Sequence, residues 1–124
     1  MCDYRDLLGV RYTPHGRSRE DGFDCYGLCI EVLRRNGITL PDLYYESMKD
    51  SEKICSGLKG LRATKIDRPE ENCIVEITNC GEPSHMAVYI GDGLMIHTMI
   101  KTKVCIEPLK HYEHRINGYW RVND

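Results

Sequence analysis

The sequence predicts an α+β domain, in which helices come first along the chain and an antiparallel sheet follows. Up to residue 37 the apolar residues recur at helical spacing, which indicates a largely buried helix. After Pro69 the pattern changes to short runs rich in β-branched residues, joined by connections too short for a parallel crossover. A chain of 124 residues can form its own core, so we expect a single domain over residues 1–124 with the helix packed on the sheet.

The main predicted helix begins after Asp24 and ends at Asn36-Gly37. Aspartate is a favoured N-cap, and Asn-Gly is a favoured helix stop. Between these points the helix carries only three charged residues, Glu31, Arg34 and Arg35. At about 100° per residue they share one narrow arc, so we expect the rest of the helix surface to be buried.

Two further helical segments are predicted on either side of this helix, at residues 3–8 and from Pro41 to about Gly60. The strands are predicted from runs of Val, Ile, Thr and aromatic residues that are bounded by turn residues. They are Cys73–Ile77, His85–Ile90, Leu94–Ile100, Val104–Glu107 and Tyr119–Val122.

The connection at Gly91-Asp92-Gly93 predicts how two of these strands pair. A three-residue loop with its last glycine in the left-handed region fits this sequence and pairs Ile90 with Leu94. In this register His85 and His97 lie on the same face of the sheet, diagonal to each other. A two-residue loop would place them on opposite faces, because a shift of one residue turns every side chain over. We therefore expect the two imidazoles to be neighbours.

Composition and charge exclude several classes of partner. The formal net charge is −2, so the sequence offers no attraction to nucleic acid or to an anionic membrane surface. No apolar run approaches the roughly 20 residues of a membrane span. The N-terminus, Met1 to Asp6, is charged and lacks the apolar core of a signal peptide. We expect cytoplasmic synthesis, and any release must avoid the general secretion route.

The seven cysteines include no C-x-x-C pair, which excludes a zinc ribbon and a thioredoxin motif. The sequence thus predicts no metal site and no cofactor. An odd count without a signal sequence also argues against a disulfide scaffold. We expect six of the seven to be reduced and to pack as small apolar side chains: Cys2, Cys29, Cys55, Cys73, Cys80 and Cys105.

Cys25 differs from these six because it follows the predicted N-cap and so lies at the start of the helix. The positive end of the helix dipole and a nearby imidazolium lower the pKa of a thiol, which favours the nucleophilic thiolate. We expect His85 to be the proton acceptor and His97 to hold the far nitrogen of its ring. The backbone N–H of Cys25 would contribute to an oxyanion hole. These residues predict a cysteine hydrolase.

Three segments carry a resemblance to a known family. The string Gly22-Phe23-Asp24-Cys25-Tyr26-Gly27-Leu28 resembles the signature of NlpC-type cysteine peptidases, and Ser84–Gly93 resembles their histidine strand. His97, in Met95-Ile96-His97, stands where the family has its third polar residue. The resemblance implies a reduced papain-like fold with Cys25 as nucleophile, His85 as base and His97 as orienter. It also implies a substrate-binding role for Tyr12, and we expect Asp24, Tyr26 and Ser84 to contact substrate as well.

These peptidases are bacterial and phage cell-wall hydrolases, so the resemblance implies an endopeptidase that cuts the peptide stems of peptidoglycan. The bond expected to be cleaved lies on the D-γ-glutamyl side of the diamino acid. Tyr26 in place of the usual serine, Arg17-Ser18-Arg19 and Gly118-Tyr119-Trp120-Arg121 are more similar to the phage-tail branch. The expected partners are therefore stem peptides and phage tail proteins, and the expected place of action is the cell wall.

Two other functions remain open on the sequence. The first is a non-catalytic tail-assembly or plug protein that keeps the fold, although the complete set of Cys25, His85 and His97 argues against degeneration. The second is a metal-binding protein that uses this set together with Cys29, but the spacing matches no known zinc pattern. Metal analysis would identify a metal protein, and turnover of purified muropeptide would separate an enzyme from an assembly protein.

Overall fold

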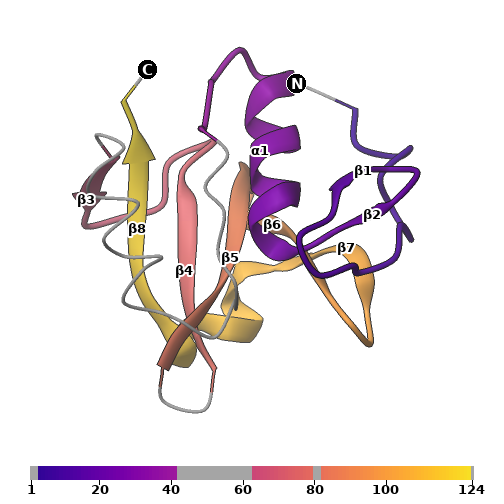
Figure 1. Cartoon of the computed structure of the whole chain (residues 1–124). Helices are drawn as coiled ribbons and strands as arrows, with labels where there is room; N and C mark the ends of the chain where they lie inside the picture. The colour runs from indigo at the N-terminus through magenta and orange to yellow at the C-terminus, as the bar shows by residue number, and fades with distance from the viewer. Residues whose placement is uncertain (1–2, 42–62, 80–81, 124) are drawn as a thin grey trace.

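A computed structural model of the chain describes residues 3–41, 63–79 and 82–123 (Figure 1). In chain order the elements are β1 (Arg17–Ser18), β2 (Gly22–Phe23), α1 (Cys25–Arg35), β3 (Ala63–Ile66), β4 (Ile74–Asn79), β5 (Glu82–Gly91), β6 (Leu94–Met99), β7 (Lys103–Pro108), the 3₁₀ helix η1 (Leu109–Arg115) and β8 (Ile116–Val122). Six strands form one antiparallel sheet in the order β3-β8-β4-β5-β6-β7. The predicted α+β class is confirmed. The helix predicted from Pro41 to about Gly60 falls on residues 42–62, which lie outside the described residues.

α1 is the long helix, and it forms where the sequence predicts it. The Asp24 carboxylate caps its first turn by accepting from the Gly27 N–H at 2.6 Å. At the other end Asn36 is the C-cap, and Gly37 has a φ of +78°, a left-handed conformation that glycine adopts without strain. Across the described part of the chain, no helix is long and apolar enough to span a membrane.

The helix predicted at residues 3–8 is wrong, because this segment is a run of turns. The Leu7 N–H donates to the Tyr4 carbonyl, and the Val10 N–H donates to the Leu7 carbonyl, so the bonds span three residues and not four. The chain then pairs with β7: the Gly9 N–H donates to the Val104 carbonyl, and the Val104 N–H donates to the Val10 carbonyl. Pairing with the edge of the sheet thus replaces continuation of a helix.

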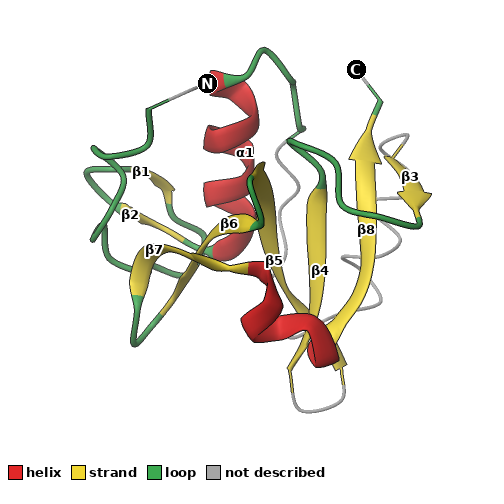
Figure 2. Ribbon diagram, turned by 180° about the vertical axis from the view of Figure 1, so that it is seen from behind, coloured by secondary structure: helices red, strands yellow, loops and turns green. Residues whose placement is uncertain are grey.

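Two layers of apolar side chains cover the two faces of the sheet. On one face α1 lies along β5 and β6, with Leu28 and Leu33 in one core cluster with Met86 of β5 (Figure 1). On the other face lies η1, whose Tyr112 packs in a second cluster with Ala87 (Figure 2). Successive residues of β5 therefore serve opposite faces, as the alternation of side chains in a strand requires.

The five predicted strands are all present, and two of them are longer than predicted by three or more residues. β5 begins at Glu82 and not at His85, and β8 begins at Ile116 and not at Tyr119. Residues Ala63–Ile66 form β3, an edge strand on β8 that the sequence did not reveal. None of its four side chains is fully buried, so it lacks the apolar alternation by which strands are recognised.

The hairpin between β5 and β6 has a two-residue turn and not the predicted three-residue loop. Asp92 and Gly93 have φ values of +55° and +76°, and Gly91 pairs with Leu94. Such a turn alone would place the two histidines on opposite faces. A bulge at Ile90 adds one residue to β5 and restores the predicted register beyond it. The predicted outcome is therefore right although the predicted loop is wrong.

Candidate active site

Cys25 is the first residue of α1, and it is 2% exposed. Its sulfur accepts a hydrogen bond from the backbone N–H of Met86 in β5, the residue that directly follows His85. The predicted nucleophile therefore lies against the strand that carries the predicted base.

The thiol and the imidazole are both neutral in the free protein. Burial raises the pKa of Cys25 to about 12, although the backbone N–H groups of Met86 and of Cys25 itself act in the opposite direction. Burial likewise lowers the pKa of His85 to about 3, and the charge of His97 adds to this shift. The predicted thiolate is wrong, because removing the sulfur from water outweighs the effect of the helix terminus.

We expect the neutral His85 to make the fold less stable in acid. In the unfolded chain its pKa is near the ordinary 6.5, and in the fold it is about 3. Below pH 6.5 the unfolded state therefore binds a proton that the folded state excludes, so stability falls as the pH drops toward 3, by up to about 1.4 kcal/mol per pH unit. Thermal unfolding measured from pH 7 down to about pH 4.5 should show a steeper loss for the wild type than for His85→Gln. The exposed His114 gives the control, because His114→Gln should lose stability as the wild type does.

A relay of polar side chains begins at His85 and crosses to β7 and η1. Nε2 of His85 lies 2.9 Å from Nδ1 of His97, so the predicted contact between the imidazoles is confirmed. Nε2 of His97 lies 2.5 Å from Oε2 of Glu107, and the Tyr112 hydroxyl donates to the same oxygen at 2.8 Å. The ring of His97 has no exposed surface, so water does not reach the centre of the relay.

Glu107 is the member of this relay that the sequence analysis missed. Burial acts to raise its pKa, but hydrogen bonds from Tyr112 and His97 outweigh burial and leave the pKa lowered. Glu107 is therefore a carboxylate. The available signal was an acidic residue at the end of the predicted strand that follows the His97 strand.

The carboxylate fixes the position of each proton in the relay. A carboxylate only accepts, so His97 must donate to Glu107 from Nε2. A neutral His97 then has a bare Nδ1, which accepts from the Nε2–H of His85. This leaves a lone pair on Nδ1 of His85. The relay therefore holds His85 in the tautomer of a base, as deprotonation of Cys25 requires.

Asp24 organises the loop before the helix and has no exposed surface. Its Oδ1 accepts from the Gly27 N–H at 2.6 Å and from the Arg17 guanidinium at 2.8 Å, and its Oδ2 accepts from the His15 N–H at 3.1 Å. The loop approaches so closely that a Cβ at position 27 would lie 2.1 Å from the Gly16 carbonyl oxygen. Asp24 is thus a helix cap and a loop anchor, and its predicted contact with substrate stays a prediction.

The other predicted substrate-binding residues have different surroundings. Tyr12 is half-buried; burial raises its pKa to about 12 and the nearby Cys25 adds to the shift, so its hydroxyl lies near the thiol. Tyr26 is 1% exposed and its hydroxyl donates to the Pro41 carbonyl at 2.7 Å, and its predicted contact with substrate stays a prediction. Ser84 belongs to β5, and its side chain lies outside the described part of the structure.

Comparison with known proteins identifies the group to which these motifs belong. The model of the NlpC/P60 family matches residues 9–121. The chain belongs to the NlpC/P60 family. This match confirms the predicted NlpC-type family, and the structure confirms the predicted fold, in which the helix that begins at Cys25 packs on an antiparallel sheet.

Relatives of this NlpC/P60 domain are found among curated proteins and solved structures. The gamma-DL-glutamyl hydrolase of Bacillus subtilis is 31% identical over 97% of this chain and 26% of its own length. An NlpC/P60 family protein from Bacillus cereus is 28% identical, with a TM-score of 0.68 over 94% of this chain and 36% of that one. The peptidoglycan hydrolase RipB of Mycobacterium tuberculosis shares the fold at 19% identity, with a TM-score of 0.63 over 97% of this chain and 61% of that one. The chain thus spans about a quarter of the length of the Bacillus subtilis relative.

The described cysteines of this NlpC/P60 domain are free thiols, but they differ in burial. Cys29 and Cys73 are 2% exposed, as predicted. Cys105 is only partly buried, which differs from the prediction, because it faces polar groups of the relay: its sulfur lies 3.6 Å from Nε2 of His97. Three further cysteines predicted to be buried lie outside the described residues: Cys2, Cys55 and Cys80.

The sequence left open a metal site built from Cys25, Cys29, His85 and His97, but the metal-ligating side chains group differently in the structure. Within the described residues, His97, Cys105 and Glu107 form the one group of at least three such residues whose ligand atoms lie close enough to share an ion. Cys25 and Cys29 do not belong to it. The metal site considered from sequence is therefore not the arrangement found.

Proposed function

We propose that the chain is a cysteine hydrolase that cleaves the peptide stems of bacterial peptidoglycan, with Cys25 as nucleophile, His85 as base and His97 as orienter. The observation that carries this proposal is the relay, which holds His85 as a base in the strand whose Met86 N–H donates to the helix-terminal thiol of Cys25. Membership of the NlpC/P60 family supports it, as does the shared fold with a peptidoglycan hydrolase of Mycobacterium tuberculosis. The complete relay also favours an enzyme over an assembly protein that merely keeps the fold.

Acylation starts from two neutral groups, so the proton moves as the new bond forms. Nδ1 of His85 takes the thiol proton of Cys25 while the sulfur attacks the carbonyl carbon of the substrate. The resulting imidazolium is stabilised by His97, which in turn donates to the carboxylate of Glu107. When the C–N bond breaks, His85 returns the proton to the leaving amine, and a thioester remains on Cys25.

Hydrolysis of the thioester reverses these roles. His85 takes a proton from water, the oxygen attacks the thioester carbonyl, and the proton then restores the thiol of Cys25. The negative oxygen formed in both steps needs donors. The backbone N–H of Cys25 is one. The Tyr12 hydroxyl is a second candidate, because its raised pKa of about 12 keeps it protonated near the thiol.

The bond that we propose is the amide after a D-γ-glutamyl residue, on the side of the diamino acid. Its support is the Bacillus subtilis relative, which is by name a gamma-DL-glutamyl hydrolase. A place in a phage tail is a further proposal that rests on sequence features alone. The relatives named above add no support for the phage tail.

Turnover of defined substrates tests the function. We expect purified muropeptide stems to be cleaved after the D-γ-glutamyl residue, with a new amine on the diamino acid that mass spectrometry detects. A γ-DL-glutamyl polymer without a diamino acid serves as the second substrate. Cleavage of the polymer alone would contradict the peptidoglycan substrate, and cleavage of neither by the folded protein would contradict the hydrolase.

Two substitutions at His97 should lose activity to different extents. His97→Asn should keep measurable turnover, because its amide oxygen can still accept from the Nε2–H of His85. His97→Ala should lose roughly 10²- to 10⁴-fold in kcat, since the base is then no longer held in one tautomer. Thermal unfolding of both variants checks that the buried site still folds. If His97→Ala turned over muropeptide as the wild type does, His97 would not be the orienter.

The burial of Cys25 should make it a slow thiol in the absence of substrate. Its pKa of about 12 and its 2% exposure predict slower reaction with a disulfide reagent than the partly exposed Cys105 shows, at both about pH 6 and about pH 9. Site-resolved labelling followed by mass spectrometry measures both rates. Preferential labelling of Cys25 at about pH 6 would instead indicate the thiolate that the sequence predicts.

A further inference from the structure

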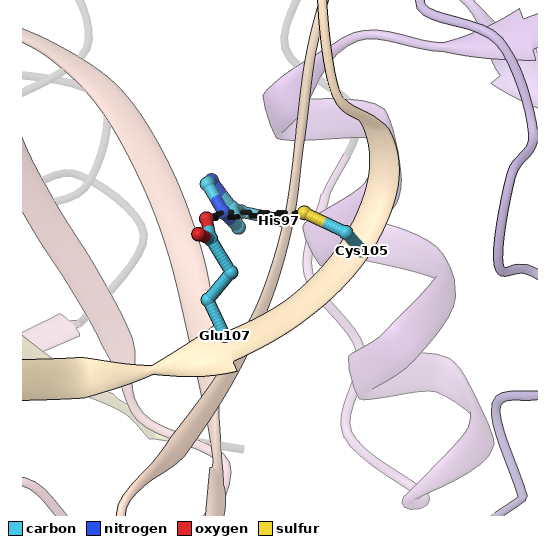
Figure 3. A group of neighbouring side chains, drawn as sticks. All are labelled: His97, Cys105 and Glu107. Carbon is cyan, nitrogen blue, oxygen red and sulfur yellow. Dashed lines mark hydrogen bonds and ion pairs between the residues drawn. The ribbon is translucent and has the colours of Figure 1, made fainter. Parts of the chain in front are cut away.

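Three metal-ligating side chains of three chemical kinds meet on the hairpin of β6 and β7. Nε2 of His97 lies 3.6 Å from Sγ of Cys105 and 2.5 Å from Oε2 of Glu107, and the sulfur lies 3.9 Å from the same oxygen. Figure 3 shows the three side chains turned toward one another. The mechanism uses His97 and Glu107, and it gives no role to Cys105.

The strand register explains why these side chains meet. His97 of β6 is directly opposite Cys105 of β7, and Glu107 follows two residues later on the same face. In the pairing of β6 with β7, Leu94 is opposite Pro108 at one end and Met99 is opposite Lys103 at the other, with no bulge between them. A regular hairpin therefore holds all three ligand atoms, and little chain order has to be created when an ion binds.

The distances suit a small tetrahedral ion. Zinc bonds of roughly 2.0–2.3 Å place neighbouring tetrahedral ligand atoms roughly 3.3–3.8 Å apart. Both sulfur distances are already close to this range, and the contact between His97 and Glu107 has to open by somewhat less than 1 Å. Thiolate, imidazole and carboxylate are the ligands that zinc takes in proteins.

The site is open from one side. His97 has no exposed surface, whereas Cys105 and Glu107 are each partly exposed, so an ion can reach the cluster through them. The Tyr112 hydroxyl donates to Glu107, so it lies close to the cluster.

We propose that His97, Cys105 and Glu107 form an inhibitory Zn²⁺ site. Binding releases the thiol proton of Cys105 to solvent, and the sulfur becomes a thiolate ligand. It also displaces the proton from Nε2 of His97, and the ring stays neutral by carrying its proton on Nδ1. No oxidant or reductant is needed.

Inhibition follows from the reversal of the relay, and this part rests on the proposed function. A proton on Nδ1 of His97 donates to Nε2 of His85, which must then be bare. His85 consequently carries its proton on Nδ1, the nitrogen that has to accept from Cys25. Zinc at the hairpin therefore removes the base without touching the nucleophile.

Spectroscopy on the full chain tests the site without any turnover. Co²⁺ replaces zinc as a coloured probe, and we expect a sulfur-to-cobalt absorption band that Cys105→Ala removes. The matched control is Cys73→Ala, at a free buried thiol that stands outside the cluster, and it should keep the band. With ¹⁵N-labelled histidine, Zn²⁺ should move the protonated nitrogen of His85 from Nε2 to Nδ1. A cobalt band that survives Cys105→Ala would overturn the site.

Turnover of muropeptide tests the consequence. Zn²⁺ should inhibit the wild type reversibly, and a chelator should restore activity. Cys105→Ala should keep the basal rate and require at least about tenfold more Zn²⁺ for the same inhibition. Equal inhibition of wild type and Cys105→Ala would place the effect elsewhere, at Cys25 for example, and would overturn the proposal. Cobalt binding together with no cleavage of any substrate would keep the site and contradict the proposed function instead.

Discussion

Cys25→Ala should abolish turnover of muropeptide. No other group can form the thioester, and removal of the nucleophile from a catalytic triad lowers kcat by roughly 10⁴-fold or more. The substitution removes one sulfur from a buried position at the start of α1, so the fold should remain and KM should change little. Steady-state kinetics on the stem peptide, with thermal unfolding of the same sample, measures both effects.

Cys29→Ala is the matched control for this prediction. Cys29 lies one turn further along α1 and has the same 2% exposure as Cys25, so the two changes remove a thiol from similar surroundings. We expect Cys29→Ala to keep wild-type kcat. If both variants lost activity to the same extent, the loss at Cys25 would come from helix packing and not from chemistry.

The helix and the meeting of the two histidines could be predicted because each depends on local signals. Asp24 and Asn36-Gly37 mark the ends of α1 within the sequence, and capping depends on neighbouring residues only. The face shared by His85 and His97 was also predicted, but through a loop that does not form. The turn and the bulge each shift the register by one residue, so their effects cancel.

Glu107 could not be assigned in the same way, because its role depends on pairing between strands. Its side chain meets His97 only through the register of β6 with β7, and meets Tyr112 only because η1 folds back on the sheet. The same packing explains why Cys105 is not the buried thiol predicted from composition. Cys105 lies on the edge strand β7, so its neighbours are the side chains of β6 across the hairpin, His97 among them.

The protonation state of the site also depends on the complete fold. A helix terminus and a neighbouring histidine are visible in sequence, and both favour a thiolate. The amount of water removed from Cys25 is not visible, and burial is the largest cause of its raised pKa. A neutral pair makes the tautomer of His85 decisive, because the imidazole must accept the thiol proton as the sulfur attacks. The carboxylate of Glu107, at the far end of the relay, therefore controls that tautomer.

Glu107→Gln should lower kcat by roughly 10²- to 10⁴-fold, although it changes one atom and no volume. The amide can donate as well as accept, so the protonated nitrogen of His97 is no longer determined. In the wrong state His97 carries its proton on Nδ1, and His85 then holds its proton on the nitrogen that should be bare. Loss of the correct tautomer in a serine protease triad costs about 10⁴-fold.

The kinetic pattern separates this effect from a loss of structure. Glu107→Asp keeps an acceptor that cannot donate, so we expect it to retain more activity than Glu107→Gln despite its shorter side chain. Glu70→Gln removes a charge from an exposed pair with Arg121 and should leave kcat unchanged. In ¹⁵N spectra, Glu107→Gln should show part of His85 with its proton on Nδ1, in proportion to the lost activity. Full activity in Glu107→Gln, with His85 still protonated on Nε2, would mean that the carboxylate does not set the relay.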